Sequence, residues 1–236
     1  MGNGKLYLIP SEISPGTGQQ TINNQVAEAI RECNYFLTEN IRTARRYISS
    51  LKLDITIESL NFEVLDKKTD KSQLKELLKP LFLGSSIGVL SEAGCPGVAD
   101  PGALAVEVAH QHQIQVVPLV GPSSILLALM GSGFNGQSFV FHGYLPIDKK
   151  ERTASIRKLE KEAAKLHQTQ IFMDTPYRNQ HLFDDLLQTC ANNTLLSVAK
   201  VITGENEEIR TMTIAQWKNV KIALHKIPVI FSLYVR

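Results

Sequence analysis

The residues of this chain that point most directly to chemistry lie between Gly88 and Gly102, where an apolar run leads into a loop of small residues and then into the start of a helix. Asp100 is placed to cap that helix, and Pro101 suits its first turn. The glycines of the loop allow backbone N–H and C=O groups to approach a ligand without interference from side chains. Because open α/β sheets bind ligands at the carboxyl ends of their strands, the pattern predicts a site for a small, polar, nucleoside-like ligand.

A second group of candidate residues is basic. Arg42, Arg45 and Arg46 lie three and four residues apart, on the side of a predicted helix opposite its apolar positions. Arg42 stands at the start of this helix, beside the expected ligand crevice, and Arg178 follows a turn after a later strand. These arginines have two interpretations, contact with a phosphate or an ordinary solvated side chain.

The first half of the chain alternates short β-rich runs with amphipathic helical patterns, which is typical of a largely parallel sheet. Strands are predicted at residues 5–9, 35–38, 62–65, 87–90 and 114–119. Helices are predicted around residues 26–30, 41–51, 74–81 and 104–109. We therefore expect an α/β domain over residues 1–118, with the glycine loop at the carboxyl edge of its sheet.

In the second half the predicted strands follow one another more closely, so antiparallel pairing is expected. A turn at residues 121–124 precedes an apolar helix, and a long charged helix follows later, with helices predicted at residues 125–130, 149–165 and 182–187. Strands are predicted at residues 139–144, 170–174, 195–201, 210–214 and 228–235. This pattern indicates a second α/β domain over residues 119–236, with a mixed sheet.

The composition is that of an ordinary globular protein. The 236 residues are 43% hydrophobic, which is enough for one large packed core or two small ones. A formal net charge of +2 is compatible with an RNA partner, but it lies far below the charge density of an obligate nucleic-acid binder. The three cysteines are widely spaced, and the residues before Pro10 lack the long apolar run of a signal peptide or membrane helix. We therefore expect a cytoplasmic protein with no membrane partner.

Several other side chains have a structural interpretation. The six histidines show no metal-ligand spacing with cysteines or carboxylates, so no metal is expected. Cys95 is interpreted as a small loop residue, because no histidine or lysine lies close in sequence to activate its thiol. The stretch from Lys149 to Lys165 interleaves basic residues with Glu151, Glu160 and Glu162, which is more typical of a solvated helix than of a nucleic-acid surface.

Four ordered motifs carry a resemblance to a known family. They are SEAGCPGVADPG at residues 91–102, GPSS at 121–124, GYLP at 143–146 and TPYR at 175–178. Together they resemble the tetrapyrrole methylase superfamily, and within it the branch that methylates the ribose 2′-oxygen of a cytidine in 16S ribosomal RNA. The resemblance extends over nearly the whole chain, because ENIRTARR at residues 39–46 also fits a family segment. Each motif alone is a weak signal, whereas the ordered set is specific.

The resemblance implies two α/β domains with S-adenosylmethionine in the cleft between them, a ribosomal RNA substrate and a homodimer. Without it, Glu92 has two interpretations, a cofactor contact at the end of a buried strand or solvation of the loop, while the serines are interpreted as helix caps and the strand-end residues as sheet core. Arg42, Arg45 and Arg178 are the implied substrate-binding residues. The implied cofactor-binding residues are Glu92, Gly94, Cys95, Pro96, Gly97, Val98, Ser123, Ser124, Met173, Asp174, Ala199, Pro228 and Val229.

Methyl transfer from a sulfonium requires the protein mainly to hold donor and acceptor in line and to exclude water. A ribose hydroxyl becomes a good nucleophile as its proton leaves, so a proton acceptor is expected nearby. The candidates are Glu39, Glu205 and a Lys200 with a lowered pKa, and the sequence does not choose among them.

Three segments depart from the pattern of the RNA-modifying branch. Pro-Ile-Gly-Asn-Leu after the first strand is replaced by residues 10–17 (PSEISPGT), Asp-Thr-Arg by residues 40–42 (NIR), and Glu-Ser-Pro-His-Arg by residues 174–178 (DTPYR). The expected cofactor residues are therefore better retained than the expected substrate residues. The chain is predicted to be an RNA methyltransferase, with tetrapyrrole methylation and a cofactor-binding protein without transfer activity as the alternatives.

Overall fold

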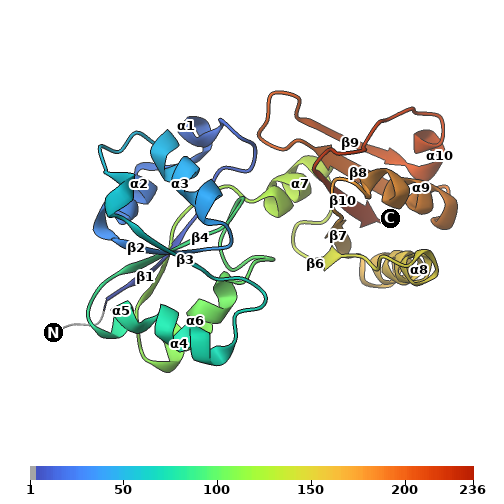
Figure 1. The fold of residues 1–236 in the computed structure, drawn as a ribbon. Coiled ribbons are helices and arrows are strands. Elements are labelled where there is room, and N and C mark those ends of the chain that lie inside the picture. The colour runs from blue at the N-terminus through green and yellow to red at the C-terminus, as the bar shows by residue number, and fades with distance from the viewer. Residues whose placement is uncertain (1–3) are drawn as a thin grey trace. The chain divides into compact units, whose positions relative to one another are not determined.

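The computed structural model describes residues 4–236 and contains two α/β units, the first ending at Ser123 and the second beginning at Ser124 (Figure 1). Each unit has its own five-stranded sheet. The predicted class, two α/β domains, is confirmed. The sequence places the boundary after residue 118, whereas the contacts within the chain divide it after residue 123.

The sheet of the first unit is entirely parallel, with the strand order β3-β2-β4-β1-β5. Its central strand β4 is buried along its whole length, as expected for a parallel strand with both faces covered. All of these strands point their carboxyl ends to one edge of the sheet. Their bounds are β1 Leu6–Ile9, β2 Tyr35–Thr38, β3 Asn61–Val64, β4 Ile87–Leu90 and β5 Val116–Pro118.

Helices cover both faces of this sheet (Figure 1). On one face, α2 (Asn24–Glu32) and α3 (Ile41–Ser50) pack on a core that includes Ile9 and Phe36. On the other face, α4 (Lys71–Leu77) and α6 (Gly102–Gln111) pack on a core that includes Leu37 and Val89. The short elements are α1 (Gly18–Thr21), the 3-10 helix η1 (Ile57–Ser59) and α5 (Lys79–Phe82).

The helix predicted over residues 74–81 is wrong as a single element. The structure has two helices there, α4 and α5, which meet at Leu78. Pro80 lies in the first turn of α5, where its missing N–H costs nothing, but it could not continue α4 because its ring would clash with the preceding turn. Asp70 starts α4 through a capping box with Gln73.

The sheet of the second unit is mixed, with the strand order β6-β7-β10-β8-β9. The β6–β7 pair is parallel, and the other three pairs are antiparallel. This agrees with the antiparallel pairing expected from the close spacing of the strands. The bounds are β6 Phe139–Tyr144, β7 Thr169–Met173, β8 Leu195–Lys200, β9 Glu208–Thr213 and β10 Val229–Tyr234.

Helices also cover both faces of the second sheet. The main core lies under α8 (Lys149–Leu166) and α9 (Asn179–Thr189) and includes Phe172, Phe231 and Trp217. On the opposite face α7 (Ser124–Ser132) packs against β8 and β10. A short helix, α10 (Ile214–Trp217), follows β9 directly.

Candidate functional site

The loop after β4 is shaped by residues with left-handed backbone conformations. Gly94 and Gly97 have φ angles of 76° and 81°, and Ala99 has a φ of 62°. Glycine adopts such angles without the steric cost that a Cβ brings. The loop therefore turns sharply twice between the end of a buried strand and the start of α6, which presents main-chain atoms at the carboxyl edge of the sheet.

Asp100 holds this loop together. Its Oδ1 accepts hydrogen bonds from the backbone N–H of Gly97 at 2.6 Å and from that of Gly102 at 2.8 Å. The helix begins at Gly102 and Pro101 holds the N-cap position, one residue later than the sequence predicted. The Asp100 side chain nevertheless satisfies the first N–H of α6, as a cap does, and it also ties the helix start to the loop.

The loops after β1, β4 and β5 are bonded to one another. Ser11 and Gly94 exchange backbone hydrogen bonds of 2.9 and 3.2 Å, and the Ser11 hydroxyl donates to the carbonyl of Ser91. The Cys95 thiol lies 3.3 Å from the carbonyl of Pro122 in the loop after β5. Burial raises the pKa of this thiol, and Asp100 adds to the effect, so Cys95 is a neutral donor and fits its interpretation as a small loop residue.

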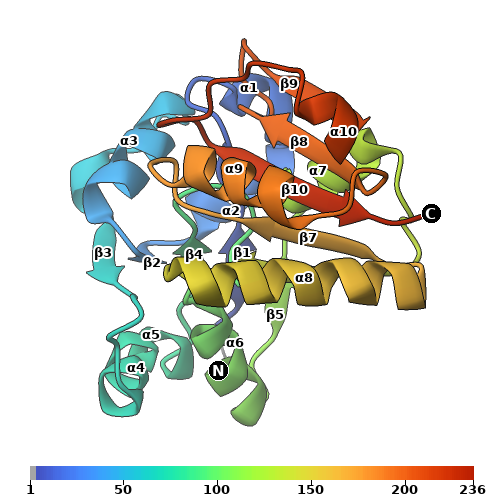
Figure 2. The same ribbon diagram turned by 90° about the vertical axis from the view of Figure 1, so that its right-hand side faces the viewer.

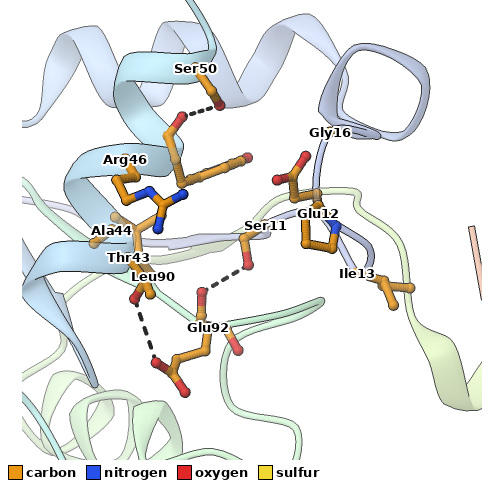
Figure 3. Close-up of a pocket in the computed structure, with 13 residues that line it drawn as sticks. Ser11, Glu12, Ile13, Gly16, Thr43, Ala44, Arg46, Ser50, Leu90 and Glu92 are labelled. Carbon is orange, nitrogen blue, oxygen red and sulfur yellow. Dashed lines mark hydrogen bonds between the residues drawn. The ribbon is translucent and has the colours of Figure 1, made fainter. Parts of the chain in front are cut away.

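A pocket of about 400 Å³ lies beside these loops in the first unit (Figure 3). This volume falls within the range of small-molecule sites. Three segments form its walls, namely the loop after β1, the helix α3 and the end of β4. The lining residues are Ser11, Glu12, Ile13, Pro15, Gly16, Thr43, Ala44, Arg46, Tyr47, Ser50, Leu90, Ser91 and Glu92.

The pocket combines two carboxylates with one guanidinium. Glu12 is oriented by the backbone N–H of Gly18, which donates to its Oε2 at 2.8 Å. Glu92 stands on the exposed rim, with the Thr43 hydroxyl 3.5 Å from its Oε1. Arg46 reaches the pocket from α3, on the side opposite Glu12 (Figure 3). The arrangement provides acceptors for hydroxyl or amino groups and one cation for a phosphate.

The basic residues of α3 have different surroundings. Arg42, Arg45 and Arg46 are all exposed, and the guanidinium of Arg45 lies 5.6 Å from the centroid of the Phe62 ring. The sequence-based substrate set contains Arg42 and Arg45, but Arg46 is the one that lines the pocket. All three lie on one helical face, so the sequence alone does not show which of them lines the pocket. The difference between Arg45 and Arg46 depends on Phe62 of β3, which lies beside Arg45.

Glu39 directly follows β2 and belongs to a group of carboxylates in the first unit. It lines a small hollow together with Thr38, Leu90 and Asp100. Partial burial raises the pKa of Glu39, and the nearby carboxylates Asp100 and Glu92 raise it further. A carboxyl group with a raised pKa is a stronger base once ionised.

The other two candidate proton acceptors have different environments. Lys200 ends β8 and forms a 2.6 Å ion pair with Glu208 across the β8–β9 register. Its amine is therefore engaged as a donor. Glu205 is exposed in the turn that joins these two strands.

The predicted cofactor residues of the second unit are brought together by strand register. Met173 and Ala199 both pair with Ile230, one from each neighbouring strand. Val229 begins β10, and the carbonyl of Pro228 accepts the N–H of Val201 at 3.1 Å. Pro228 precedes the strand, where its missing N–H leaves no gap in the ladder.

Asp174 follows β7 and is buried. Its Oδ1 accepts the N–H of Thr175 at 2.7 Å and hydrogen bonds from the Nε and Nη2 atoms of Arg178. Its Oδ2 is buried without a hydrogen-bond partner in the part of the chain that the structure describes. Arg178, predicted to contact substrate, is thus engaged with Asp174.

Ser123 and Ser124 lie where the two units are divided. Ser124 is the first residue of α7, one residue before the helix start predicted from the sequence. Among residues 4–236 there is no group of three His, Cys, Asp or Glu side chains arranged to hold a metal ion. Within the same residues, no helix is long and apolar enough to cross a bilayer.

The comparisons with known proteins agree with the fold and with the motifs. The family of tetrapyrrole (corrin/porphyrin) methylases matches residues 16–218 of the chain. The chain therefore belongs to this family, and the resemblance identified from the sequence is confirmed.

Relatives of this chain include proteins named ribosomal RNA small subunit methyltransferase I. The protein of Buchnera aphidicola subspecies Schizaphis graminum is 29% identical over 206 residues, which cover 87% of this chain and 68% of the relative. The protein of Halalkalibacterium halodurans is 27% identical over 213 residues, covering 90% and 69% of the two chains. The crystal structure of the methyltransferase CobJ has the same fold, with a TM-score of 0.62 at 16% identity over 98% of this chain and 94% of that one.

Proposed function

We propose that this protein is an S-adenosylmethionine-dependent methyltransferase that methylates a ribose 2′-oxygen of small-subunit ribosomal RNA. Membership of the methylase family and the name shared by the relatives support the activity and the RNA substrate. The proposal goes beyond this support in three respects: the methyl group is accepted by the 2′-oxygen, the protein is located in the cytoplasm, and it works as a homodimer.

The observation that carries the proposal is the juxtaposition of two unlike features at the carboxyl edge of the first sheet. The loop held by Asp100 offers main-chain atoms, which suits a nucleoside that is recognised through its edges. The adjoining pocket offers Arg46 and two carboxylates in about 400 Å³, which suits one nucleotide of an RNA chain. A tetrapyrrole, a larger ring that bears several carboxylates, would favour a wider pocket with more cations.

The residues predicted to hold the methyl donor fit such a ligand. In the first unit these are Glu92, the segment 94–98 and Ser123, and in the second unit they include Asp174. The unpartnered Oδ2 of Asp174 is an acceptor that a hydrogen-bond donor of the nucleoside would satisfy, because a buried carboxylate oxygen is costly to leave unpaired. When bound, the donor supplies a sulfonium-activated methyl group, and the chain supplies binding, orientation and exclusion of water.

We assign the acceptance of the 2′-hydroxyl proton to Glu39. Its raised pKa supports this role, because the Glu39 carboxylate takes up a proton more readily than the carboxylate of an exposed glutamate does. Lys200 is less suited because its amine is occupied by Glu208. In the reaction the oxygen–carbon bond forms as the carbon–sulfur bond breaks, the proton passes to the carboxylate and S-adenosylhomocysteine leaves.

The proposal is tested by incubating the protein with tritium-labelled S-adenosylmethionine and small-subunit ribosomal RNA from cells that lack the gene, both as free RNA and as assembled subunits. Digestion to nucleosides should give the label in a 2′-O-methylated nucleoside. Label in a base would contradict the ribose assignment. Label in a precorrin-type acceptor with unlabelled RNA would instead support tetrapyrrole methylation, and donor binding without any transfer would support a cofactor-binding protein.

A further inference from the structure

Helix α8 of the second unit carries a row of exposed basic side chains on one face. We call this row the α8 stripe and define it as Lys150, Arg157, Lys161 and Lys165. Residues separated by four and by seven or eight positions lie on the same side of an α-helix, so these side chains follow one another along its axis. All four are exposed, and none of them forms an ion pair with another of the residues 4–236.

The stripe faces away from the core because the opposite side of α8 is firmly anchored. Ile156, Leu159 and Ala163 are buried in the main core of the second unit. Arg152 is also buried on that side, where its Nη2 lies 2.6 Å from Asp185. Figure 2 shows α8 along the margin of the second unit. The helix cannot rotate to hide the stripe without exposing this apolar side.

Two of the three acidic residues of α8, Glu160 and Glu162, are engaged with partners outside the stripe. The Glu160 carboxylate is turned toward residues 191–194, where it accepts the Ala191 N–H at 2.7 Å and the Thr194 hydroxyl at 2.5 Å. Glu162 lies 3.8 Å from Lys158, a lysine outside the stripe. The alternation of acidic and basic residues predicted a solvated helix. Glu162 shares a hollow with Arg157, Lys161 and Lys165, but its carboxylate is paired with Lys158, so the four basic side chains of the stripe keep an excess of positive charge.

We propose that the α8 stripe binds the phosphate backbone of the RNA substrate outside the nucleotide that is methylated. The inference rests on the proposed function, which it extends to a second contact region. From Lys150 to Lys165 the helix rises on the order of 22 Å, at about 1.5 Å per residue, which is long enough to meet several successive phosphates. Lysine and arginine side chains at such a surface contribute affinity that does not depend on sequence.

An anionic membrane is the other partner that a basic helix could suggest. A helix that binds at a membrane surface inserts an apolar face into the lipid. The apolar face of α8 is instead buried in the core, through Ile156, Leu159 and Ala163. Because α8 has exposed charge but its apolar face is buried, RNA is favoured over a membrane as the partner of the stripe.

The test compares three proteins by the salt dependence of their affinity for a labelled fragment of small-subunit ribosomal RNA. The first is the parent chain, and the second carries Arg157→Gln, Lys161→Gln and Lys165→Gln. The third is a control of equal net charge with Lys68→Gln, Lys75→Gln and Lys79→Gln, three exposed positions in the first unit. Glutamine retains high helix propensity, so thermal unfolding should be similar for all three.

The stripe variant should lower the magnitude of the slope of log K against log salt by about 2, because each contact to a single-strand phosphate contributes about 0.7. The control should keep the parent slope, and the affinity of all three proteins for S-adenosylmethionine should be equal. An unchanged slope in the stripe variant, while the parent binds RNA, would overturn this inference and leave the proposed function standing. Failure of the parent to bind RNA would overturn both, and so would binding of the parent only to anionic vesicles.

Discussion

The loops that follow β1 and β4 lie side by side in the first unit, yet they are held in different ways. The β4 loop is fixed by main-chain geometry and by one carboxylate, Asp100, that bonds two of its N–H groups. The β1 loop is fixed by side chains, through Glu12 on the N–H of Gly18 and through the Tyr47 hydroxyl on the carbonyl of Pro10 at 2.8 Å. Apart from Glu92 on the pocket rim, the β4 loop presents mainly backbone, whereas the β1 loop presents the Glu12 side chain to the pocket.

This difference explains why the two loops can diverge independently. A ligand recognised by main-chain atoms constrains glycines and the residue that holds them, whereas a pocket lined by side chains can change its acceptor through single substitutions. The β4 loop of this chain keeps the family pattern, and the β1 loop departs from it. The comparison predicts that changes in the β4 loop affect donor binding and that changes in the β1 loop affect transfer.

The largest effect is expected for Asp100→Ala, which removes both hydrogen bonds to the loop and to the start of α6. We expect a loss of about 2 kcal/mol in the free energy of unfolding, as for a helix cap with a charged acceptor, and at least a tenfold loss of donor affinity. Denaturant unfolding and calorimetry measure the two effects. Asp100→Asn retains an acceptor oxygen and should lose less of both. Equal losses in the two variants would show that the charge, and not the geometry of the clamp, is responsible.

A somewhat smaller effect is expected for Gly102→Ala. A Cβ there would lie 2.9 Å from Asp100 Oδ1 and 3.0 Å from the nitrogen of Gly97, so it would press on the clamp itself. We expect a loss of about 1–2 kcal/mol in stability together with weaker donor binding. At Gly97 the nearest atom to a new Cβ is 3.8 Å away, so Gly97→Ala should add only backbone strain. If donor affinity fell more in Gly97→Ala than in Gly102→Ala, crowding of the clamp would not be the cause.

Glu12→Gln should distinguish the functional roles of the two loops most clearly. The glutamine carbonyl can still accept the N–H of Gly18, so the fold and donor affinity should be retained while the charge in the pocket is lost. We expect methyl transfer to RNA to fall by roughly tenfold, the scale of one polar contact. Single-turnover assays with labelled donor measure this. Glu28→Gln, an exposed change on α2, is the matched control, and an equal loss there would refute a role for Glu12 in the pocket.

The smallest effect on stability is expected for Glu39→Gln. Burial and the neighbouring carboxylates raise the pKa of Glu39 above its ordinary value of 4.5, so the folded chain holds this proton more tightly than the unfolded chain does. The contribution of Glu39 to stability therefore falls as the pH rises from 4.5 through the raised pKa, and the substitution should remove that contribution and leave the variant slightly more stable than the parent at neutral pH. Melting temperatures of parent and variant across this range measure the effect. If the parent instead gained stability relative to the variant as the pH rose, the predicted direction of the Glu39 pKa shift would be contradicted.

The strands and the β4 loop could be predicted from the sequence because their signals are local. The apolar run of residues 87–90 and the small residues after it predict a strand and a tight loop without reference to the rest of the chain. The break at Leu78 was missed because the apolar pattern continues across it, although Pro80 was the available signal.

The side-chain environments could not be predicted, because they depend on residues far apart in the chain. Arg45 and Arg46 share a helical face, and only the packing of β3 places Phe62 beside Arg45. The pairing of Lys200 with Glu208 requires the β8–β9 register. The burial of Arg152 beside Asp185 likewise appears only when α8 and α9 pack.

The central claim is that the β4 loop binds the methyl donor and the β1 loop does not. Calorimetric titration of the parent, Asp100→Ala and Glu12→Gln with S-adenosylmethionine tests it most directly. The account predicts equal affinity for the parent and Glu12→Gln, with at least a tenfold loss in Asp100→Ala. No binding by the parent, or a loss confined to Glu12→Gln, would contradict it.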